Sequence, residues 1–516
     1  MPEFNFLQHL PAIAPEVGLT FMAIVILLLD SYLPEKLRPN IAFVSAIGMA
    51  FLAITPFIWA AVYTPEQVAA GENLLWGGMI RHDALAQIFK VMILLGGAIT
   101  SLIAYSDSGT KNRGEFHLII VIATLGGCLM AGAADLIMVF VALETLSIPL
   151  YILATFNRDS SFSAESGLKY FLFGSFASAI MLYGFSLLYG FSGTTDLQGI
   201  ATAMNTGVII GDNIFPVLIA TVMVVVGFGF KVGAVPFHFW TPDVYEGAPT
   251  PVTAYISVAS KAASFALLVR FLIYVFGIDE SLVAVNGQTI QTFWVGLVST
   301  MAVLSMTFGN VLALRQTNIK RLLAYSSIAQ AGYVLVGVAS LQATSEIGLE
   351  FSISSVAFYM FMYTFSNLVV FAGIVLVTES LGSEEIADLA GLQRRNPWIA
   401  LTMTIGLLSL GGIPPTAGFI GKLFLFQAAV EANLVGLAIL GVLNAIIALY
   451  YYLVVVKIMY VDETPDERAI SVATPYAWVL GITAIVVVLL GTFAVSPIMD
   501  WAREGAAAVA ALSGAG

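Results

Sequence analysis

Three lysines and one glutamate lie deep within long apolar stretches of this sequence, where a charged side chain is costly. Lys231 directly follows the uncharged run PVLIATVMVVVGFGF (216–230), and Lys261, Lys422 and Glu144 lie in similar surroundings. A lysine at membrane depth costs between about 2.5 and more than 10 kcal/mol, depending on the method. Ionisable groups in such places usually face a polar interior or a pathway. The residues therefore favour a path for ions or protons, with a structural salt bridge as the alternative.

Other ionisable residues near the apolar stretches have a simpler interpretation. Lys90 follows His82 and Asp83, and we expect it to snorkel or to pair locally, with a functional role as the less favoured reading. Three basic residues near the ends of apolar stretches are expected to snorkel: Arg270, Lys457 and Lys169.

Proline and glycine interrupt two of the apolar stretches beside these lysines. AVPFHFWTPDVYEGAPTP follows Lys231, and GLLSLGGIPPTAGFIGK (406–422) ends at Lys422. Proline lacks a backbone donor, and the backbone groups freed by a break need a polar or hydrated cavity. Transporters use such broken helices to build ion sites, although an ordinary proline kink is the alternative. The residues expected at the two breaks are Pro236, His238, Pro414 and Pro415.

The composition requires a membrane as the surrounding solvent. Of the 516 residues, 59% are hydrophobic and only 10% are charged, against roughly 25% charged in soluble domains. The one cysteine, Cys128, excludes disulfides, thiolate clusters and c-type haem. The net charge of −12 is a small imbalance over this length, and nucleic-acid binding is not expected. The four histidines lack ligand spacing: His9, His82, His117 and His238.

The apolar stretches predict an all-α polytopic membrane protein. A helix needs about 20 residues to cross the hydrocarbon core, and about fourteen stretches reach that length. The predicted spans are 13–33, 41–63, 80–104, 115–133, 135–156, 165–191, 213–238, 250–276, 290–314, 321–341, 348–380, 398–428, 433–460 and 470–498. An even number places both termini on the same side.

The basic residues orient these spans. Alternate loops hold most of the 20 lysines and arginines, and the positive-inside rule assigns those loops to the cytoplasm and both termini to the outside. The loops assigned to the cytoplasm contain Lys36, Arg38, Lys111, Arg113, Arg158, Lys169, Arg315, Lys320, Arg321, Arg394, Arg395, Lys457 and Arg468. The opposite side has Arg81, Arg270 and Arg503.

The two breaks also predict an internal repeat. They fall in the seventh and twelfth spans, and a unit of five spans has odd parity, so its second copy is inverted. We expect spans 4–8 and 9–13 to form this inverted repeat. The predicted organisation is an N-terminal three-helix segment, a first repeat, a second inverted repeat, and a C-terminal helix with a tail: 1–113, 114–278, 279–461 and 462–516.

Five motifs resemble the antiporter-like membrane subunits of proton-pumping NADH:quinone oxidoreductase (respiratory complex I), most closely the group called N. The block around Lys231 is highly specific to these proteins. The motifs are ALETLSIPLYIL (142–153), SGLKYFLFGSFASAIMLYG (166–184), FKVGAVPFHFWTPDVYEGAPTPVTAYISVASKAA (230–263), QTNIKRLLAYSSIAQAGY (316–333) and GGIPPTAGFIGKLFLF (411–426).

The resemblance implies roles for the buried charges. It makes Glu144 the fifth-span partner of Lys231, Lys261 the connecting lysine and Lys422 the terminal one. Where many relatives have histidine in the tenth span, this chain has Gln330, which cannot titrate. A relay through this region would then use water or three nearby hydroxyls: Ser326, Ser327 and Tyr333.

Physical chemistry indicates how such a relay could pump. Burial disfavours a charged lysine and a nearby carboxylate favours it, so a moving or neutralised Glu144 would change the proton affinity of Lys231. We expect protons to pass from Lys231 to Lys261 to Lys422, driven by quinone reduction in partner subunits.

By resemblance, NADH, FMN, Fe–S clusters and quinone belong to partner subunits, and this chain is a non-redox translocase subunit without a cofactor. Expected partners are neighbouring membrane subunits and, indirectly, the redox arm, in a bacterial inner membrane. The alternatives are a subunit of a multisubunit Na⁺/H⁺ antiporter, a ferredoxin- or hydrogenase-linked relative, and a purely structural membrane subunit.

Overall fold

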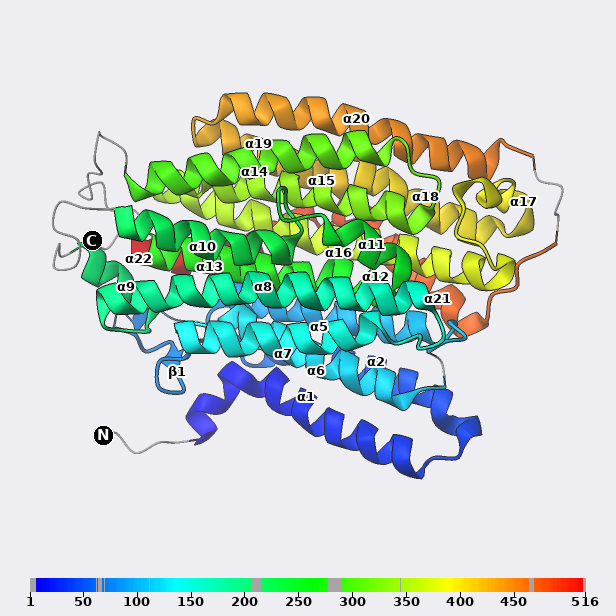
Figure 1. Cartoon of the computed structure of the whole chain (residues 1–516), viewed down its shortest axis with the longest axis horizontal. Helices are drawn as coiled ribbons and strands as arrows, with labels where there is room; N and C mark the ends of the chain where they lie inside the picture. The colour runs from blue at the N-terminus through cyan, green and yellow to red at the C-terminus, as the bar shows by residue number, and fades with distance from the viewer. Residues whose placement is uncertain are drawn as a thin grey trace.

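The computed structural model of the chain is an elongated bundle of long helices (Figure 1). It describes residues 6–61, 63, 67–68, 70–110, 112–205, 215–276, 289–343, 345–463 and 468–513. Within these ranges, twelve helices are long and apolar enough to cross a membrane, and a bent pair near the C-terminus raises the number to thirteen. The prediction of an all-α polytopic membrane protein is confirmed.

The helices run roughly along the long axis of the molecule. Their bounds are α1 (Phe6–Tyr32), α2 (Ile41–Leu52), α3 (Thr55–Ile58), α5 (Ala84–Ala104), α6 (Gly114–Gly132), α7 (Leu136–Ala154), α8 (Ser161–Ser192), α9 (Leu197–Asn205), α10 (Phe215–Val232), α11 (Trp240–Gly247), α12 (Thr250–Tyr255), α13 (Lys261–Val275), α14 (Ile290–Ala313), α15 (Ile319–Ala339), α16 (Glu346–Leu381), α17 (Leu392–Arg395), α18 (Pro397–Gly411), α19 (Ala417–Glu431), α20 (Val435–Tyr460), α21 (Thr474–Leu490) and α22 (Val495–Ser513). A small hairpin pairs β1 (Leu74–Leu75) with β2 (Ile80–Arg81).

The helices form a buried centre and an exposed periphery. The span Thr250–Val275, which joins α12 to α13, is buried throughout, and so is the middle of α16; most of α15 and α5 is buried as well. By contrast, α1, α8 and α20 expose much of their apolar surface and lie toward the outside of the bundle (Figure 1). The central helices are therefore shielded from lipid by the outer ones.

Polar side chains start several of these helices at defined residues. Asp83 accepts the N–H of Ala86 at the start of α5, and Asn318 accepts the N–H of Lys320 at the start of α15. Such caps satisfy donors that a helix leaves unpaired at its first turn. They fix where each span begins.

Two helices break where the sequence predicts. Gly233 follows α10 and Gly412 follows α18, and both have a left-handed backbone (φ +70° and +84°) that favours glycine. The breaks also contain cis peptide bonds, Val235–Pro236 in the first and Pro414–Pro415 in the second. The second halves of these broken helices are α11 and α19. The predicted breaks in the seventh and twelfth spans are confirmed.

The C-terminal part differs in one respect from the spans expected from the sequence. The predicted span 398–428 is the broken twelfth span, made of the two short helices α18 and α19 as expected. The predicted span 470–498 continues past a bend of 77° between α21 and α22. The inverted repeat stays a prediction, and its boundary at 278–279 and the basic residue at position 111 lie outside the described residues.

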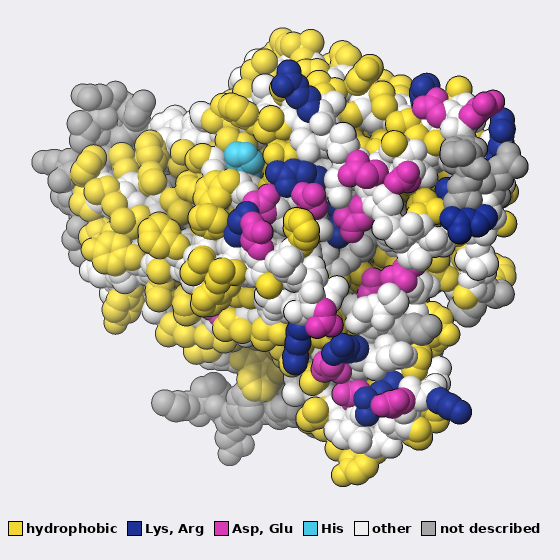
Figure 2. Space-filling model, turned by 45° about the vertical axis from the view of Figure 1, so that its right-hand side comes forward, with side chains coloured by type: hydrophobic (Ala, Val, Ile, Leu, Met, Phe, Trp, Pro, Cys, Tyr) yellow, Lys and Arg dark blue, Asp and Glu magenta, His cyan; other side chains and the backbone are white. Residues whose placement is uncertain are grey.

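Charged side chains gather at one end of the bundle. Figure 2 shows Lys, Arg, Asp and Glu side chains clustered on the face toward the viewer, with hydrophobic side chains on the flanks. We call this the charged end; it includes α17 and the start of α15 (Figure 1). The start of α1 and the helix α22 lie at the opposite end (Figure 1).

Candidate functional site

Lys231 lies in the last turn of α10, immediately before the first break. It is 4% exposed, and its Nζ donates to Ser147 Oγ on α7. The rings of Tyr151 and Phe230 lie 5.6 and 5.8 Å from this Nζ. A hydroxyl and two aromatic faces therefore surround the ammonium group, and its hydrogen-bond partner is neutral.

Lys261 begins α13, directly after a π-helical turn at Ile256–Ser260. It is 2% exposed, and its Nζ donates to Ser327 Oγ at 2.5 Å and to the Ser327 carbonyl at 2.8 Å. A Cβ added to Gly233 would lie 3.7 Å from this Nζ. Lys261 therefore lies between the first break and α15.

Lys422 lies on α19, beyond the second break. It is 5% exposed, and its Nζ donates to the carbonyls of Leu410 at 2.9 Å and Gly411 at 3.2 Å. Both carbonyls belong to the last turn of α18, where no further helical N–H follows. The ring of Tyr333 lies 4.7 Å from Nζ and adds a cation–π contact. Backbone oxygens freed by the break therefore hold this lysine.

Buried hydroxyls surround Ser327 between these lysines. Tyr363 donates to Ser327 Oγ at 3.2 Å, and Tyr245 hydrogen-bonds the same oxygen at 3.0 Å. Asn367 Nδ2 reaches Tyr363 Oη at 3.2 Å and Ser257 Oγ at 2.7 Å. Lys261 is thus joined to a hydrogen-bonded group drawn from four helices.

A second group lies beside Lys422. Gln330 Nε2 donates to Leu410 O at 3.0 Å and to Tyr452 Oη at 3.1 Å, and Tyr359 donates to Gln330 Oε1. Ser326 is hydrogen-bonded to Tyr452. The two groups meet at neighbouring residues of α15, because Ser327 belongs to the first group and Ser326 to the second.

Glu144 lies on α7, one helical turn from Ser147, and attracts Lys231 electrostatically. It is half-buried, and its Oε1 has no hydrogen-bond partner among the described residues. Within that part of the chain, no ion pair joins Glu144 to Lys231; the hydroxyl of Ser147 holds the lysine instead.

The residues predicted at the breaks differ in how exposed they are. Pro236, Pro414 and Pro415 are exposed on the outside of the bundle, and His238 is half-buried. The hydroxyl of Tyr333 accepts from Asn310 Nδ2 at 3.1 Å, so Tyr333 contributes its ring to Lys422 rather than its hydroxyl.

Two other buried cations form ion pairs with carboxylates. Lys90 Nζ lies 2.7 Å from Glu16 Oε1 and donates to Ala12 O, so it pairs with α1 and does not snorkel. Arg270 is fully buried and makes a bidentate pair with Asp83 at 2.7 and 2.8 Å. The prediction that Arg270 snorkels is wrong, because the start of α5 supplies a carboxylate at the end of α13.

At the charged end, an ionic network ties the second half of the first broken helix to its neighbours. Asp243 on α11 accepts from Lys169 of α8 at 2.5 Å and from Arg321 of α15 at 3.0 Å. Arg321 also binds Glu246 at 2.7 Å. Lys169 is held by these ions, whereas Lys457 is exposed and pairs with Asp462.

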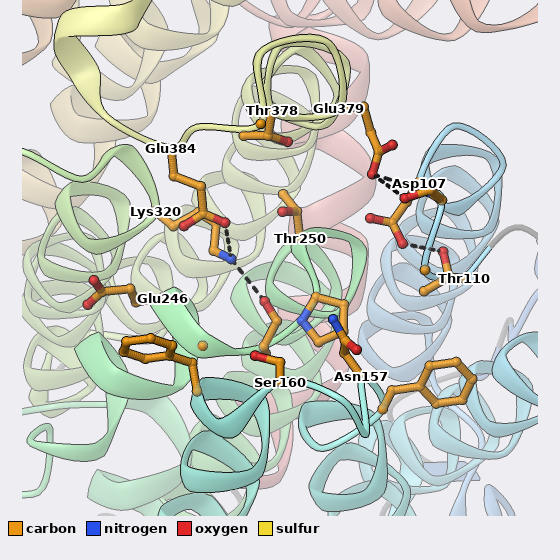
Figure 3. Close-up of a pocket in the computed structure, with 18 of the residues that line it drawn as sticks. Asp107, Thr110, Asn157, Ser160, Glu246, Thr250, Lys320, Thr378, Glu379 and Glu384 are labelled. Atoms are coloured by element: carbon orange, nitrogen blue, oxygen red, sulfur yellow. Dashed lines mark hydrogen bonds and ion pairs between the residues drawn. The ribbon is translucent and has the colours of Figure 1, made fainter.

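A cavity of about 520 Å³ opens at the charged end beside this network (Figure 3). Figure 3 shows Asp107, Glu379 and Glu384 around it, with Lys320 between Glu384 and the backbone of α11–α12. Burial raises the pKa of Asp107, as does the charge of Glu379, against a hydrogen bond from Thr110. One wall of the cavity therefore carries a carboxyl group, that of Asp107, which binds a proton more readily than an ordinary aspartate.

The cavity lies close to Lys261. Glu246 and Thr250 line it, and Tyr245, which hydrogen-bonds Ser327, is the residue next to Glu246. Thr253 Oγ1 donates to the Tyr245 carbonyl at 3.0 Å. The α11–α12 connection is thus the layer between the cavity and the group around Lys261.

Sequence reasoning missed most of the side chains that bond the lysines or the polar residues beside them. Four of these residues lie in apolar stretches where aromatic and small residues are ordinary packing residues: Ser147, Tyr359, Tyr363 and Tyr452. Their helical spacing carries no signal of a partner on another helix. Tyr245 lies in the proline-containing segment after Lys231. Across the described ranges, no group of three or more His, Cys, Asp or Glu side chains is arranged to hold a metal ion.

Comparisons with known proteins give consistent relationships. The model of the family described as "NADH:quinone oxidoreductase/Mrp antiporter, TM" matches residues 133–448, which include Lys231, Lys261, Lys422 and Glu144. NADH-quinone oxidoreductase subunit N of Trichlorobacter lovleyi is 42% identical over 92% of this chain and 93% of its own length. The protein of the same name from Moorella thermoacetica is 38% identical over 97% of this chain and 99% of its own length.

Solved structures share the fold. A chain of respiratory complex I from Thermus thermophilus with bound aureothin has a TM-score of 0.74 and 28% identity, over 95% of this chain and 100% of that chain. A chain of an archaeal membrane-bound sulfane sulfur reductase has a TM-score of 0.81 at 22% identity, over 98% of each chain, and shows likeness of fold alone.

Proposed function

Because the chain belongs to the NADH:quinone oxidoreductase/Mrp antiporter membrane-protein family, we propose that it is the N-type proton-translocating membrane subunit of an NADH:quinone oxidoreductase. Its relatives at about 40% identity over most of their length carry that name. They favour this function over a Na⁺/H⁺ antiporter or a ferredoxin- or hydrogenase-linked complex.

One observation carries the proposal. Lys231, Lys261 and Lys422 are buried and held by hydroxyl and carbonyl oxygens, not by ion pairs with carboxylates of the described residues. A buried ion pair resists loss of either charge, because the remaining ion would lie unpaired in a low-dielectric interior. A lysine held by neutral oxygens can release its proton without that cost. Lys90 and Arg270 differ from these three lysines, because each forms a buried ion pair with a carboxylate and would resist losing its proton.

The contacts support a lateral route. Lys231 and Lys261 adjoin the same break at Gly233. The group bonded to Lys261 and the group beside Lys422 meet at the neighbouring residues Ser327 and Ser326 of α15. Protons would enter from the cavity at the charged end, through the layer that contains Tyr245. Glu144 would modulate the proton affinity of Lys231, the first lysine of this route.

The driving force would come from other subunits. In this proposal the chain is a non-redox translocase, and NADH, FMN, Fe–S clusters and quinone belong to partner subunits. Neighbouring membrane subunits would flank it in a bacterial inner membrane. The charged end would face the cytoplasm and both termini the outside, following the positive-inside rule.

The test uses Lys231→Ala and Lys422→Ala in the chromosomal copy, with Lys457→Ala as the control because Lys457 is exposed at the surface. Native gels with an NADH-oxidation stain check assembly. Proton uptake by membrane vesicles, driven by NADH, measures pumping. We expect both relay variants to assemble and to lose most pumping, whereas the control pumps normally.

Normal pumping by both relay variants would rule out the relay. Glu144→Gln should slow turnover, and an unchanged rate would make Glu144 a structural residue only. Transport that requires Na⁺ and proceeds without NADH oxidation would instead support an antiporter.

A further inference from the structure

The side chain of Gln330 lies where two tyrosines from different helices meet. Its Oε1 accepts from Tyr359 of α16, and its Nε2 donates at 3.1 Å to Tyr452 of α20. Gln330 itself is on α15 and is 1% exposed. The amide therefore joins three helices beside the second break.

The Leu410 carbonyl fixes which end of the amide faces which tyrosine. Nε2 lies 3.0 Å from this oxygen. If the amide were turned over, Oε1 would face another carbonyl oxygen at that distance, and two acceptors cannot share a hydrogen bond. The observed orientation thus follows from the end of α18.

This orientation determines where the tyrosine protons point. Tyr452 accepts from Gln330, so its own proton is free for Ser326, to which it is hydrogen-bonded. The proton of Tyr359 points at Oε1. An amide is a donor at nitrogen and an acceptor at oxygen and is not an acid–base group at ordinary pH. Neither tyrosine directs its proton toward Lys422.

We propose that Gln330 is a positioning residue that keeps the protons of Tyr359 and Tyr452 directed away from Lys422, so that a proton reaches this lysine only after the amide side chain rotates out of its place. The inference rests on the proton-translocating function proposed above. In the complete step Lys261 changes from ammonium to amine and Lys422 from amine to ammonium, and the hydroxyls return to their starting state.

Gln330 and Lys422 share one acceptor oxygen, which bears on how each of them can move. Both Lys422 Nζ and Gln330 Nε2 donate to Leu410 O. When one donor leaves, the other keeps that carbonyl satisfied, so the break does not leave a buried acceptor unpaired. The end of α18 therefore permits the two side chains to move separately.

The experiment compares Gln330→Met and Gln330→His in the assembled complex. Methionine has similar length and makes none of the three hydrogen bonds, so both tyrosines are released. We expect oxidation of NADH to continue while protons pumped per NADH fall severalfold, because the released tyrosines no longer hold their protons away from Lys422. Histidine can accept from one tyrosine and pass a proton to the other.

For Gln330→His we expect pumping to persist with a new pH dependence, because imidazole changes charge between about pH 5 and 8. The ionisable groups around this position are Tyr359, Tyr452, Tyr333 and Lys422. The wild-type ratio of protons to NADH should be flat over that range. A role in packing alone would change assembly, not this profile.

The matched controls are Gln342→Met and Gln342→His. Gln342 follows α15, donates to Ala432 O at 2.9 Å and touches neither tyrosine. Wild-type stoichiometry and a flat pH profile in both Gln330 variants would overturn the inference. If Gln330→Met fails to assemble, the pH profile of Gln330→His decides alone. Lys422→Ala in the same assay separates the two claims, because normal pumping there contradicts the proposed function itself.

Discussion

Gln330 and Lys422 donate hydrogen bonds to the same oxygen, the carbonyl of Leu410, at 3.0 and 2.9 Å. They come from different helices, and the oxygen belongs to a third. It is available because α18 ends one residue later, at Gly411, and the chain turns at Gly412. The geometry of that single turn sets the position of both side chains.

Gly412→Ala should therefore disturb the relay. The left-handed backbone costs an ordinary residue roughly 1–2 kcal/mol, and the new Cβ would lie 3.1 Å from Lys422 Cδ. We expect proton pumping per NADH to fall about tenfold or more, since small displacements of reacting groups have such effects. Gly382→Ala is the control, with φ +67° and open space around the new methyl. Equal effects in the two variants would show that backbone strain alone is responsible.

Ser327→Ala should weaken the connection at Lys261. The variant keeps the Ser327 carbonyl but removes the hydroxyl to which Lys261, Tyr363 and Tyr245 all bond. We expect slower pumping, by about tenfold, in a normally assembled complex. Ser354→Ala removes another buried serine hydroxyl, bonded only to Phe351 O among the described contacts, and should pump normally. Full pumping by Ser327→Ala would remove this hydroxyl from the route.

Lys90 should matter for stability and not for pumping. Lys90→Met leaves Glu16 buried without its partner, a change that costs about 3–5 kcal/mol. We expect less assembled complex on native gels. Lys90→Met combined with Glu16→Leu replaces both ions by apolar groups and should restore assembly, with normal pumping per complex. A double variant that assembles but does not pump would add this pair to the relay.

Asp107 should make stability depend on pH. Its pKa is raised in the folded protein, so the native state binds more protons than the unfolded state between the ordinary and the raised pKa. The contribution of this carboxyl to the free energy of unfolding is therefore favourable at low pH and is lost as the pH rises through its folded pKa. Asp107→Asn cannot ionise and keeps an oxygen for Thr110.

The measurement is the thermal midpoint of the purified complex for wild type and Asp107→Asn, between about pH 4 and 7. The variant should gain stability over the wild type as the pH increases. A difference that is constant with pH, or that shrinks as the pH rises, contradicts the raised pKa.

The burial of the lysines beside the breaks could be predicted from the sequence, but their hydrogen-bond partners could not. Lys231 and Lys422 stand out because they interrupt apolar runs beside proline and glycine, and these are local signals. Ser147 and Tyr452 contact members of the proposed relay or their partners from helices distant in sequence, and a serine or tyrosine within an apolar stretch has no distinguishing pattern. Arg270 was misread for the same reason, since Asp83 lies 187 residues away along the chain.

Exposed and buried positions of this bundle should differ in how well they tolerate substitution. Helices such as α20 meet lipid with side chains such as Ile446, which is 62% exposed, and there any apolar residue serves. Inside, even a methyl group has no room: a Cβ on Gly309 would lie 2.6 Å from the backbone of Ala329, and one on Gly406 2.8 Å from that of Ser366. Positions that face outward on helices such as α20 should therefore accept one apolar residue for another, whereas positions at close helix contacts, such as Gly309 and Gly406, should not accept any side chain.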